Sequence, residues 1–181
     1  MKNGQQGFTL GELMTSLAVM GISLSLAVPG FQTVMNNNRR ASAVNQMIST
    51  MHMARSEAVT RNLQVTICPS TNGTSCENTD WNKGWLYFPD LDSDRQVDAD
   101  EDVLGYVAET SHLEIDSAEF ATFFVYRPSG RVMVNVPGEN SGQLTFCDKR
   151  GADHARVVTI STNGQPHLSE YQMDGSDPAC A

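Results

Sequence analysis

The sequence predicts an α+β fold, in which one long amino-terminal α-helix packs on a mostly antiparallel β-sheet. Three observations predict it: an apolar run opens the chain, a helical spacing of apolar residues continues beyond that run, and short strand-like segments separated by turn signals follow. With 181 residues, of which 40% are hydrophobic and 18% charged, the chain suits one folded domain with an appended segment and is unlike a disordered tail.

Charge and hydropathy narrow the classes of function. The formal net charge of −9, from 12 basic and 21 acidic residues, argues against a protein that coats nucleic acid through bulk charge, although it leaves room for a local basic patch. The mean hydropathy of −0.31 averages a mostly apolar amino-terminal region with a polar remainder, and therefore describes neither.

The first element is an apolar run over residues 10–28, in which Glu12 is the single charge. As a helix rising about 1.5 Å per residue, this run would span about 28 Å, close to the thickness of the hydrocarbon core of a bilayer. A cleaved secretory signal peptide is one interpretation, with a small-x-small site at Ser25-Leu26-Ala27, and a plain signal anchor is another. Neither explains Glu12, because an acid within a membrane helix costs about 2.5–3.5 kcal/mol on insertion scales.

A third interpretation accounts for the acid. The segment Gly7-Phe8-Thr9-Leu10-Gly11-Glu12-Leu13 resembles the type IV prepilin motif, usually written GFTLIEL. The resemblance implies that a prepilin peptidase cuts between Gly7 and Phe8 and methylates the new amino terminus, so that the apolar helix stays on the mature protein. It also implies that the Glu12 carboxylate pairs with the Phe8 amine of a neighbouring subunit, since a buried charge is tolerable when it is paired.

Two further positions bear on this resemblance. Gly11 departs from the motif, which usually has a bulky apolar residue there, and glycine weakens a helix by about 1 kcal/mol. Pro29 falls where many family members carry a helix-kinking proline.

Helical spacing continues after the apolar run. Apolar residues follow steps of three and four, at Val44, Met47, Ile48, Met51, Ala54 and Ala58, and polar residues 36–40 mark the exit from lipid. Met47, Met51 and Met53 are interpreted as core residues, and Arg39, Arg40, Arg55 and Arg61 as a solvated or phospholipid-facing side. We predict a leader at 1–7, a membrane or filament-core helix at 8–31, its amphipathic continuation at 32–62, and a globular β-rich domain at 63–181.

Strand-like segments fill the globular domain. They are predicted at 64–68, 85–88, 103–107, 122–126, 131–134, 143–147, 156–161 and 167–171, with turn signals such as Asn72-Gly73 and Asn163-Gly164 between them. The stretches ARSEAVTRN at 54–62 and VTIC at 65–68, and Trp81 with GWLYF at 84–88, are similar to the FimT/FimU minor pilin family, whose globular type includes the type II secretion pseudopilin H. This resemblance implies a type IV pilin fold.

The four cysteines allow three disulfide pairings. An export segment places the globular domain in an oxidising compartment, and we favour Cys68–Cys76, which closes a short loop, with Cys147–Cys180, which fastens the carboxyl tail. A zinc site is the rival interpretation, but no CxxC or paired-histidine spacing supports it.

An acidic stretch at residues 90–102 has the spacing of an EF-hand calcium loop. Positions 1, 3, 5, 9 and 12 of such a loop fall on Asp90, Asp92, Asp94, Asp98 and Glu101. Arg95, however, stands where that loop needs glycine for a sharp turn. We favour a solvated hairpin loop, with calcium binding as the alternative, and predict no cofactor and no metal ligand.

No motif of catalysis appears. The histidines His52, His112, His154 and His167 form no HExxH pattern, and no GxSxG elbow, P-loop or dinucleotide fingerprint occurs, so the sequence predicts no enzyme. The resemblance implies a structural minor pilin or pseudopilin that helps to initiate a pilus near its tip. Its implied partners are major and minor pilins, the prepilin peptidase, the inner-membrane assembly platform and inner-membrane lipid. The implied location is the bacterial inner membrane, with a periplasmic globular domain, and then the filament.

Two alternatives stay open. One is a role as the tip pseudopilin of type II secretion, which would use the same apolar helix and the same pairing of Glu12. DNA capture is the other alternative, because some FimT-type relatives use a basic Gly-Arg-x-Arg motif. At the comparable place this chain has Asn163-Gly164-Gln165-Pro166-His167, and Gly130-Arg131-Val132-Met133 has only the first arginine. Lys149, Arg150 and Arg156 are the remaining candidates for a DNA-binding patch.

Overall fold

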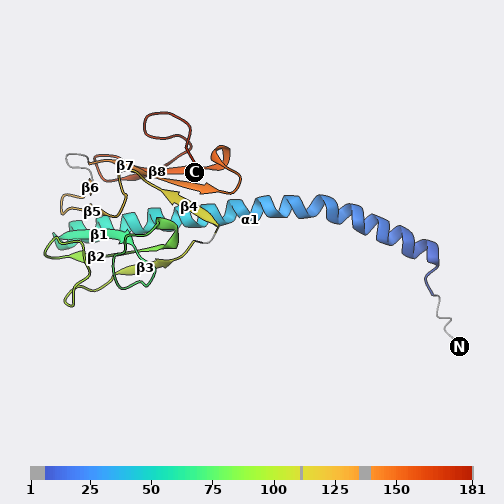
Figure 1. Cartoon of the computed structure of the whole chain (residues 1–181), viewed down its shortest axis with the longest axis horizontal. Helices are drawn as coiled ribbons and strands as arrows, with labels where there is room; N and C mark the ends of the chain where they lie inside the picture. Colours follow the sequence, from blue (N-terminus) through green and yellow to red (C-terminus); the bar gives the residue numbers. More distant parts are fainter. Residues whose placement is uncertain (1–6, 111, 135–139, 181) are drawn as a thin grey trace. The chain divides into compact units, whose positions relative to one another are not determined.

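The computed structural model describes residues 7–110, 112–134 and 140–180. The chain divides into two compact units, Met1–Arg39 and Arg40–Ala181. Helix α1, Leu10–Arg61, crosses the division, so its first part belongs to the amino-terminal unit and residues 40–61 belong to the globular unit (Figure 1). The predicted amphipathic continuation at 32–62 therefore falls mostly in the same unit as the strands.

Helix α1 has clear physical reasons for its two ends. It begins after Thr9, which caps it, and it ends where Asn62 takes a left-handed conformation with φ of 55°. Asparagine tolerates this conformation better than most residues. The Leu63 backbone N–H then donates to the Ala58 carbonyl over 3.2 Å, as in a Schellman motif, which satisfies a carbonyl of the last turn.

The globular unit contains two sheets, in which every neighbouring pair of strands is antiparallel. The five-stranded sheet has the order β3-β2-β1-β5-β6, with β1 Gln64–Pro69, β2 Gly84–Asp90, β3 Gly105–Ala108, β5 Phe124–Tyr126 and β6 Val132–Val134. The four-stranded sheet has the order β4-β7-β8-β9, with β4 Leu113–Asp116, β7 Gly142–Asp148, β8 Arg156–Ile160 and β9 Pro166–Ser169. Two short 3-10 helices, η1 Trp81–Lys83 and η2 Ala152–His154, lie in the connections.

The predicted α+β class with antiparallel strands is confirmed, but the sequence missed β4 and the division into two sheets. Strand β4 is the four-residue LEID segment, in which Leu113 and Ile115 are buried while Glu114 and Asp116 are exposed. Its alternation is too short to stand out from a loop. Its place is decided by pairing with β7, a contact between segments far apart in the sequence.

One core joins residues 40–61 of α1 to both sheets. The helical stripe buries Val44, Met47, Met51, Ala54 and Ala58, as the spacing predicts. It shares a cluster with residues of the five-stranded sheet, such as Trp85 and Phe124, and of the four-stranded sheet, such as Phe146 and Val158. Burying such side chains is worth about 1.5–3 kcal/mol each, so this stripe holds the unit together.

Hydrogen bonds of the two tryptophans fix the packing inside this core. Trp85 Nε1 donates to Thr50 Oγ1 over 3.1 Å, which ties β2 to the helix, and Trp81 Nε1 donates to the Phe120 carbonyl over 2.7 Å. Met53, which the sequence assigned to the core with Met47 and Met51, is instead 53% exposed. It falls outside the three- and four-residue steps of the buried stripe.

Candidate functional site

The amino-terminal turn of α1 is organised around Glu12. Thr9 precedes the first helical residue, and its Oγ1 accepts a hydrogen bond from the Glu12 backbone N–H over 3.3 Å. In return, Glu12 Oε2 accepts from the Thr9 backbone N–H and from Thr9 Oγ1, each over 2.9 Å. This is a reciprocal capping box, which satisfies backbone donors that a helix start leaves without intrahelical partners. The T-x-x-E spacing of residues 9–12 is the signal in the sequence from which this cap could have been predicted.

Gly7 and Phe8 lie just before this turn and are exposed, Phe8 by 89%. The bond between them is therefore accessible in the isolated chain. A Cβ placed on Gly11 would meet no atom within 4 Å, so nothing in the single chain requires glycine there. Of the predicted leader 1–7, residues before Gly7 lie outside the described residues.

The rest of the amino-terminal unit presents an apolar surface. Helix α1 is long and apolar enough to cross a membrane, and large apolar side chains of its first part are more than half exposed in the single chain, at Leu10, Leu13, Met14, Leu17, Val19, Met20, Ile22, Leu24, Val28, Phe31 and Val34. An apolar surface of this extent marks a segment that is covered by lipid or by other helices.

Two disulfides stabilise the globular unit. Cys68, in β1, is bonded to Cys76 in the loop that follows, with 5.5 Å between the Cα atoms. Cys147, in β7, is bonded to Cys180, with 5.8 Å between the Cα atoms, and so attaches the carboxyl tail to the four-stranded sheet. These are the two pairs favoured from the sequence.

Arg40 differs from the solvated or lipid-facing arginine that the sequence predicts, because it is only 7% exposed. Its Nη1 lies 3.6 Å from Asp148 Oδ2 and donates to the His154 carbonyl. Asp148 also accepts from Arg150, over 2.9 Å at Nε and 2.6 Å at Nη2. The hydrogen bonds from Arg150, aided by the charge of Arg40, lower the pKa of Asp148 to about 2. Burial, with the nearby charges of Arg156 and Arg150, lowers the pKa of Arg40.

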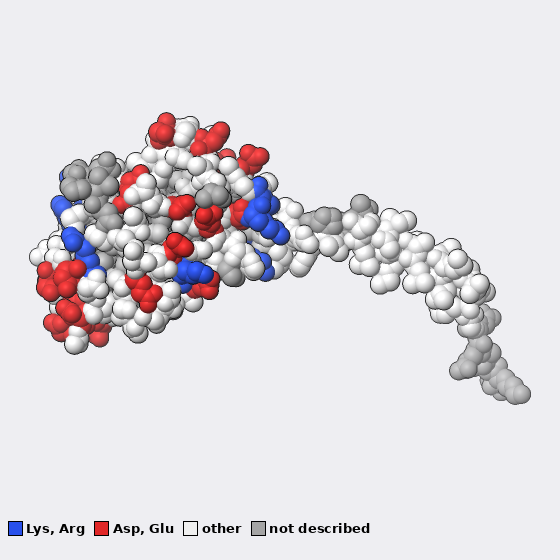
Figure 2. Space-filling model, in the orientation of Figure 1, with Lys and Arg blue, Asp and Glu red and all other residues white. Residues whose placement is uncertain are grey.

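Two of the candidate DNA-binding cations, Arg150 and Arg156, are paired with acids of the protein. Arg150 pairs with Asp148, and Arg156 Nη2 lies 3.0 Å from Glu170 Oε1. Arg55, predicted to be solvated, donates to the carbonyls of Gly130 and Asn163 over 3.0 and 3.3 Å. On the face drawn in Figure 2, basic and acidic groups are interspersed, without one continuous basic surface. This arrangement does not favour a phosphate-binding groove.

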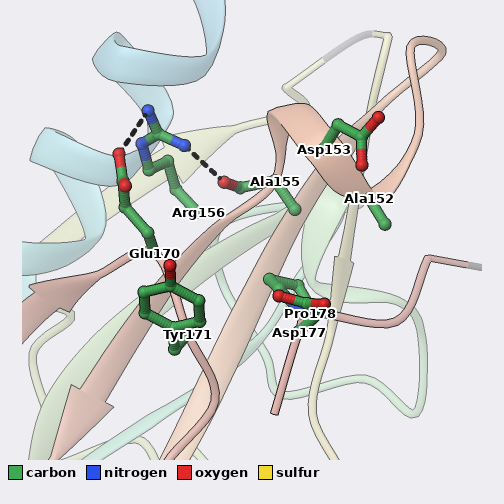
Figure 3. A pocket seen from close by; sticks show the side chains of 8 residues that line it. All are labelled: Ala152, Asp153, Ala155, Arg156, Glu170, Tyr171, Asp177 and Pro178. Carbon is green, nitrogen blue, oxygen red and sulfur yellow. Dashed lines mark hydrogen bonds and ion pairs between the residues drawn. The ribbon is translucent and has the colours of Figure 1, made fainter. Parts of the chain in front are cut away.

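A polar depression of about 410 Å³ lies beside β8 and β9 (Figure 3). Arg156 projects toward Glu170 at one side and donates to the Ala155 carbonyl over 2.7 Å, while Asp153 and Asp177 lie on the other side. The acids outnumber the single arginine, which is already paired. The depression therefore offers neither an anion site nor a nucleophile paired with a base.

The acidic loop between β2 and β3 is the described region best suited to hold a cation. One carboxylate oxygen each of Asp90, Asp92 and Asp94 lie within 4.8 Å of one another. The pKa of Asp98 is raised, most strongly by the negative charge of Asp94. Burial and the charges of Asp92, Asp100 and Asp90 raise it further. Glu101, which the spacing placed at the last ligand position, instead accepts from the backbone N–H groups of Leu91 and Asp98, over 2.6 and 3.2 Å.

The four histidines are all exposed and lie far apart in the sequence, in α1, in the turn before β4, in η2 and in β9. No group of three metal-binding side chains among the described residues includes any of them. Nothing in their arrangement suggests catalysis.

Comparisons with known proteins agree with these features. Residues 43–164, more than half of the chain, match the family model of the type II transport protein GspH, and residues 2–28 match the prokaryotic N-terminal methylation motif. The comparison with curated proteins gave no significant match.

Similar solved structures include proteins from two bacteria. Two crystal forms of the type IV minor pilin FimU of Pseudomonas aeruginosa PAO1 align at 22% identity, with TM-scores of 0.56 and 0.59, over 76% and 80% of this chain and 96% of theirs. The minor pseudopilin EpsH of the Vibrio cholerae type 2 secretion system aligns at 13% identity, with a TM-score of 0.51, over 72% of this chain and 96% of its own. The chain therefore belongs to the GspH family of type II transport proteins, carries the N-terminal methylation motif, and has the fold found in minor pilins and minor pseudopilins.

Proposed function

We propose that this protein is a minor pilin of a type IV pilus system, a structural subunit of the filament and not an enzyme. One observation carries the proposal: an exposed apolar helix bears an acid, Glu12, four residues after Phe8 within the processing motif, and it leads into a GspH-type domain. We place the apolar helix in the bacterial inner membrane and the globular unit in the periplasm. The two disulfides support the second placement, because such bonds persist in oxidising compartments.

Processing would precede assembly. The prepilin peptidase cuts between Gly7 and Phe8 and methylates the Phe8 amine, which leaves a cationic group one residue before Thr9. In the single chain the Glu12 carboxylate caps its own helix through Thr9. In a filament, the Phe8 amine of a neighbouring pilin would be a stronger partner, because charge-assisted hydrogen bonds are about twice as strong as neutral ones.

Assembly then moves the helix from lipid into a bundle of helices. The assembly platform of the inner membrane supplies the movement, and lipid contacts are replaced by contacts with the helices of major and minor pilins. The pairing between Glu12 and the amine sets the axial register. By this account the subunit helps to initiate the filament and lies near its tip, with the globular unit outside.

The variant Glu12→Ala tests the role in register. We expect membrane insertion and cleavage to be retained, because removal of the acid makes the helix more apolar, and incorporation into sheared filaments to fall at least tenfold. Glu12→Asp is the matched control, since it keeps the charge and should retain part of the incorporation. Normal incorporation of Glu12→Ala would exclude the register role.

Sequencing of the amino terminus of native material tests processing separately. We expect N-methylated Phe8 as the first residue. A protein that begins at Val28, or still at Met1, would contradict the proposal.

A pseudopilin of type II secretion is the second candidate, and the match to the GspH family model favours it. Deletion of the gene distinguishes the two systems. Loss of piliation with normal secretion assigns the protein to the pilus, and the reverse result assigns it to the secretion system.

A further inference from the structure

We propose that the loop joining β2 to β3 binds one calcium ion through the carboxylates of Asp90, Asp92 and Asp94. The loop lies in the globular unit and shares no residue with the amino-terminal motif. The proposal therefore stands or falls independently of the assembly function. Figure 2 shows acidic side chains gathered at the end of the globular unit where this loop lies in Figure 1.

The three carboxylates converge on one point. One oxygen from each lies within 4.8 Å of the other two. Two oxygens on opposite sides of a calcium ion, each about 2.4 Å from it, are about 4.8 Å apart, so the three atoms can share one ion. Like charges this close repel one another unless a cation lies between them.

Asp90 distinguishes this cluster from an ordinary acidic loop. It is the last residue of β2, paired with Gln64 of β1, and its side chain is almost completely buried, with 2% of the residue exposed. Its Oδ2 accepts from Thr66 Oγ1 over 2.6 Å. Its Oδ1 is buried as well, and within the described part of the chain no group donates a hydrogen bond to it. A buried carboxylate oxygen without a partner is unfavourable, and a bound cation supplies the missing partner.

The nearby basic side chain does not supply the missing partner of the acids. Arg95 is the one basic residue between Asp90 and Glu101. Its guanidinium lies over the Phe123 ring, 4.7 Å from the centroid, and forms no ion pair with the three acids among the residues described. Within the described ranges, no ion pair with a basic side chain therefore takes the place of a metal ion at Asp90, Asp92 and Asp94.

The backbone answers the objection raised by the sequence. Arg95 occupies the position where an EF-hand loop has glycine, but its φ is 67°, and Ser93 also has a left-handed φ of 68°. The chain therefore makes the sharp turn without glycine. Glu101, with 7% exposed, closes the loop through Leu91 and Asp98, and acts as a positioning residue rather than as a ligand.

The chemistry of the site favours calcium over magnesium and over transition metals. All its donors are oxygens, which suit hard cations, and an irregular loop adapts to the six to eight ligands of calcium more readily than to the strict octahedron of magnesium. Without a bidentate glutamate, the affinity should lie in the range of extracellular modules, with a Kd of about 10⁻⁴–10⁻³ M.

Titration of the full chain in detergent, after treatment with a chelator, tests the site. We expect calcium chloride to give a saturable heat with about one ion per chain and to raise the melting temperature by several degrees, with reversal by excess chelator. Magnesium chloride at the same concentration should give neither effect. The absence of heat and of a melting shift with calcium overturns the proposal, and equal responses to both ions overturn its assignment to calcium.

Matched variants separate a site from diffuse attraction. In the parent loop, Asp92 and Asp94 accept hydrogen bonds from the backbone N–H groups of Asp94 and Gln96. The double variant Asp92→Asn with Asp94→Asn removes both charges but supplies amide oxygens that can accept the same bonds. This double variant should lose at least tenfold in affinity while its calcium-free melting temperature stays close to that of the parent. Asp100→Asn with Asp102→Asn removes the same charge from the same loop and should bind as the parent does.

Equal losses in the two double variants would overturn the proposal in favour of nonspecific attraction. If the first double variant unfolds without calcium, the single variant Asp92→Asn replaces it, because Asp92 is exposed and its substitution leaves Asp90 and Asp94 intact. Unchanged binding by a folded Asp92→Asn protein would exclude Asp92 as a ligand, and with it the three-carboxylate site.

Discussion

At the residue scale, Glu12 has two possible partners, and this changes how a mutation there should be interpreted. In the single chain it is held by Thr9 in a capping box. Loss of Glu12 therefore removes a local helix cap together with any contact between subunits. Thr9 offers a way to separate the two effects, because among the described residues its side chain forms hydrogen bonds only with Glu12, in the cap.

Thr9→Ala should loosen the first turn of α1 without removing the acid. The loss of a cap of this kind costs about 1 kcal/mol, so the amide protons of Glu12 and Leu13, which donate to Thr9, should exchange about fivefold faster in micelles. Thr9→Ser keeps the hydroxyl and should exchange as the parent does. Hydrogen exchange followed by NMR measures both, and equal rates in Thr9→Ala and the parent would show that the cap does not hold this turn.

The lowered pKa of Asp148 predicts how the stability of the globular unit changes in acid. Its pKa is lowered from 3.8 to about 2 in the folded state, so it contributes stability that is fully present above pH 4 and is lost as the pH falls toward 2. The shift corresponds to about 2 kcal/mol. Denaturant unfolding of the parent between pH 5 and pH 2 should show this loss.

Asp148→Asn is the matching variant. It should be less stable at pH 7 by at least about 2 kcal/mol, because Arg40 and Arg150 lose a charged partner, and its stability should change less between pH 4 and pH 2. Asp102→Asn, in the exposed part of the loop between β2 and β3, is the control. If the stability of Asp148→Asn falls as steeply in acid as that of the parent, another carboxylate is responsible for the pH dependence.

At the element scale, the two disulfides constrain segments of very different length. Cys68 and Cys76 are 8 residues apart, whereas Cys147 and Cys180 are 33 apart. In the chain-entropy model, the first bond contributes about 2.5 kcal/mol and the second about 3.7 kcal/mol, because the longer loop loses more freedom in the unfolded chain.

Replacement of each pair by serine tests this order. We expect both double variants to melt below the parent, with the larger decrease for Cys147→Ser with Cys180→Ser. Peptide mapping of the unreduced parent should first find the two pairs, and a fragment that joins Cys68 to Cys147 would contradict them. The opposite order of melting temperatures would show that strain or packing outweighs loop entropy.

The elements differ in how well the sequence predicts them. The helix and most strands are predictable because each carries its own periodicity, and the buried stripe of Val44, Met47 and Met51 follows the expected spacing. Strand β4 and the second sheet cannot be predicted from the sequence, because they depend on pairing between distant segments. The same applies to Arg40: its sequence neighbours suggest a solvated arginine, while Asp148 and the His154 carbonyl, both far away in the chain, bury it.

At the scale of the whole molecule, the charge distribution argues against DNA capture. The net charge is −9, and two of the candidate cations, Arg150 and Arg156, are paired with Asp148 and Glu170. We therefore expect no mobility shift of duplex DNA by the full chain in detergent at about 50–200 mM salt, a range over which phosphate contacts weaken steeply.

Glu170→Ala with Asp148→Asn is the informative comparison, because it frees the cations for phosphate. A mobility shift that appears only with this variant would show that the ion pairs with Asp148 and Glu170 prevent the arginines from binding DNA. A salt-dependent shift by the parent itself would overturn the expectation and support the DNA-binding alternative.

The sequence by itself determined the features that depend on local pattern: the apolar helix with its single acid, the processing motif, the antiparallel strands and the spacing of the acidic loop. Tertiary structure alone decided which distant groups meet: the pairing of β4 with β7, the burial of Arg40 against Asp148, and the Asp90 oxygen left without a hydrogen-bond partner among the described residues. The reason is physical. Periodicity and motifs are properties of neighbouring residues, whereas burial and ion pairing depend on the three-dimensional path of the chain.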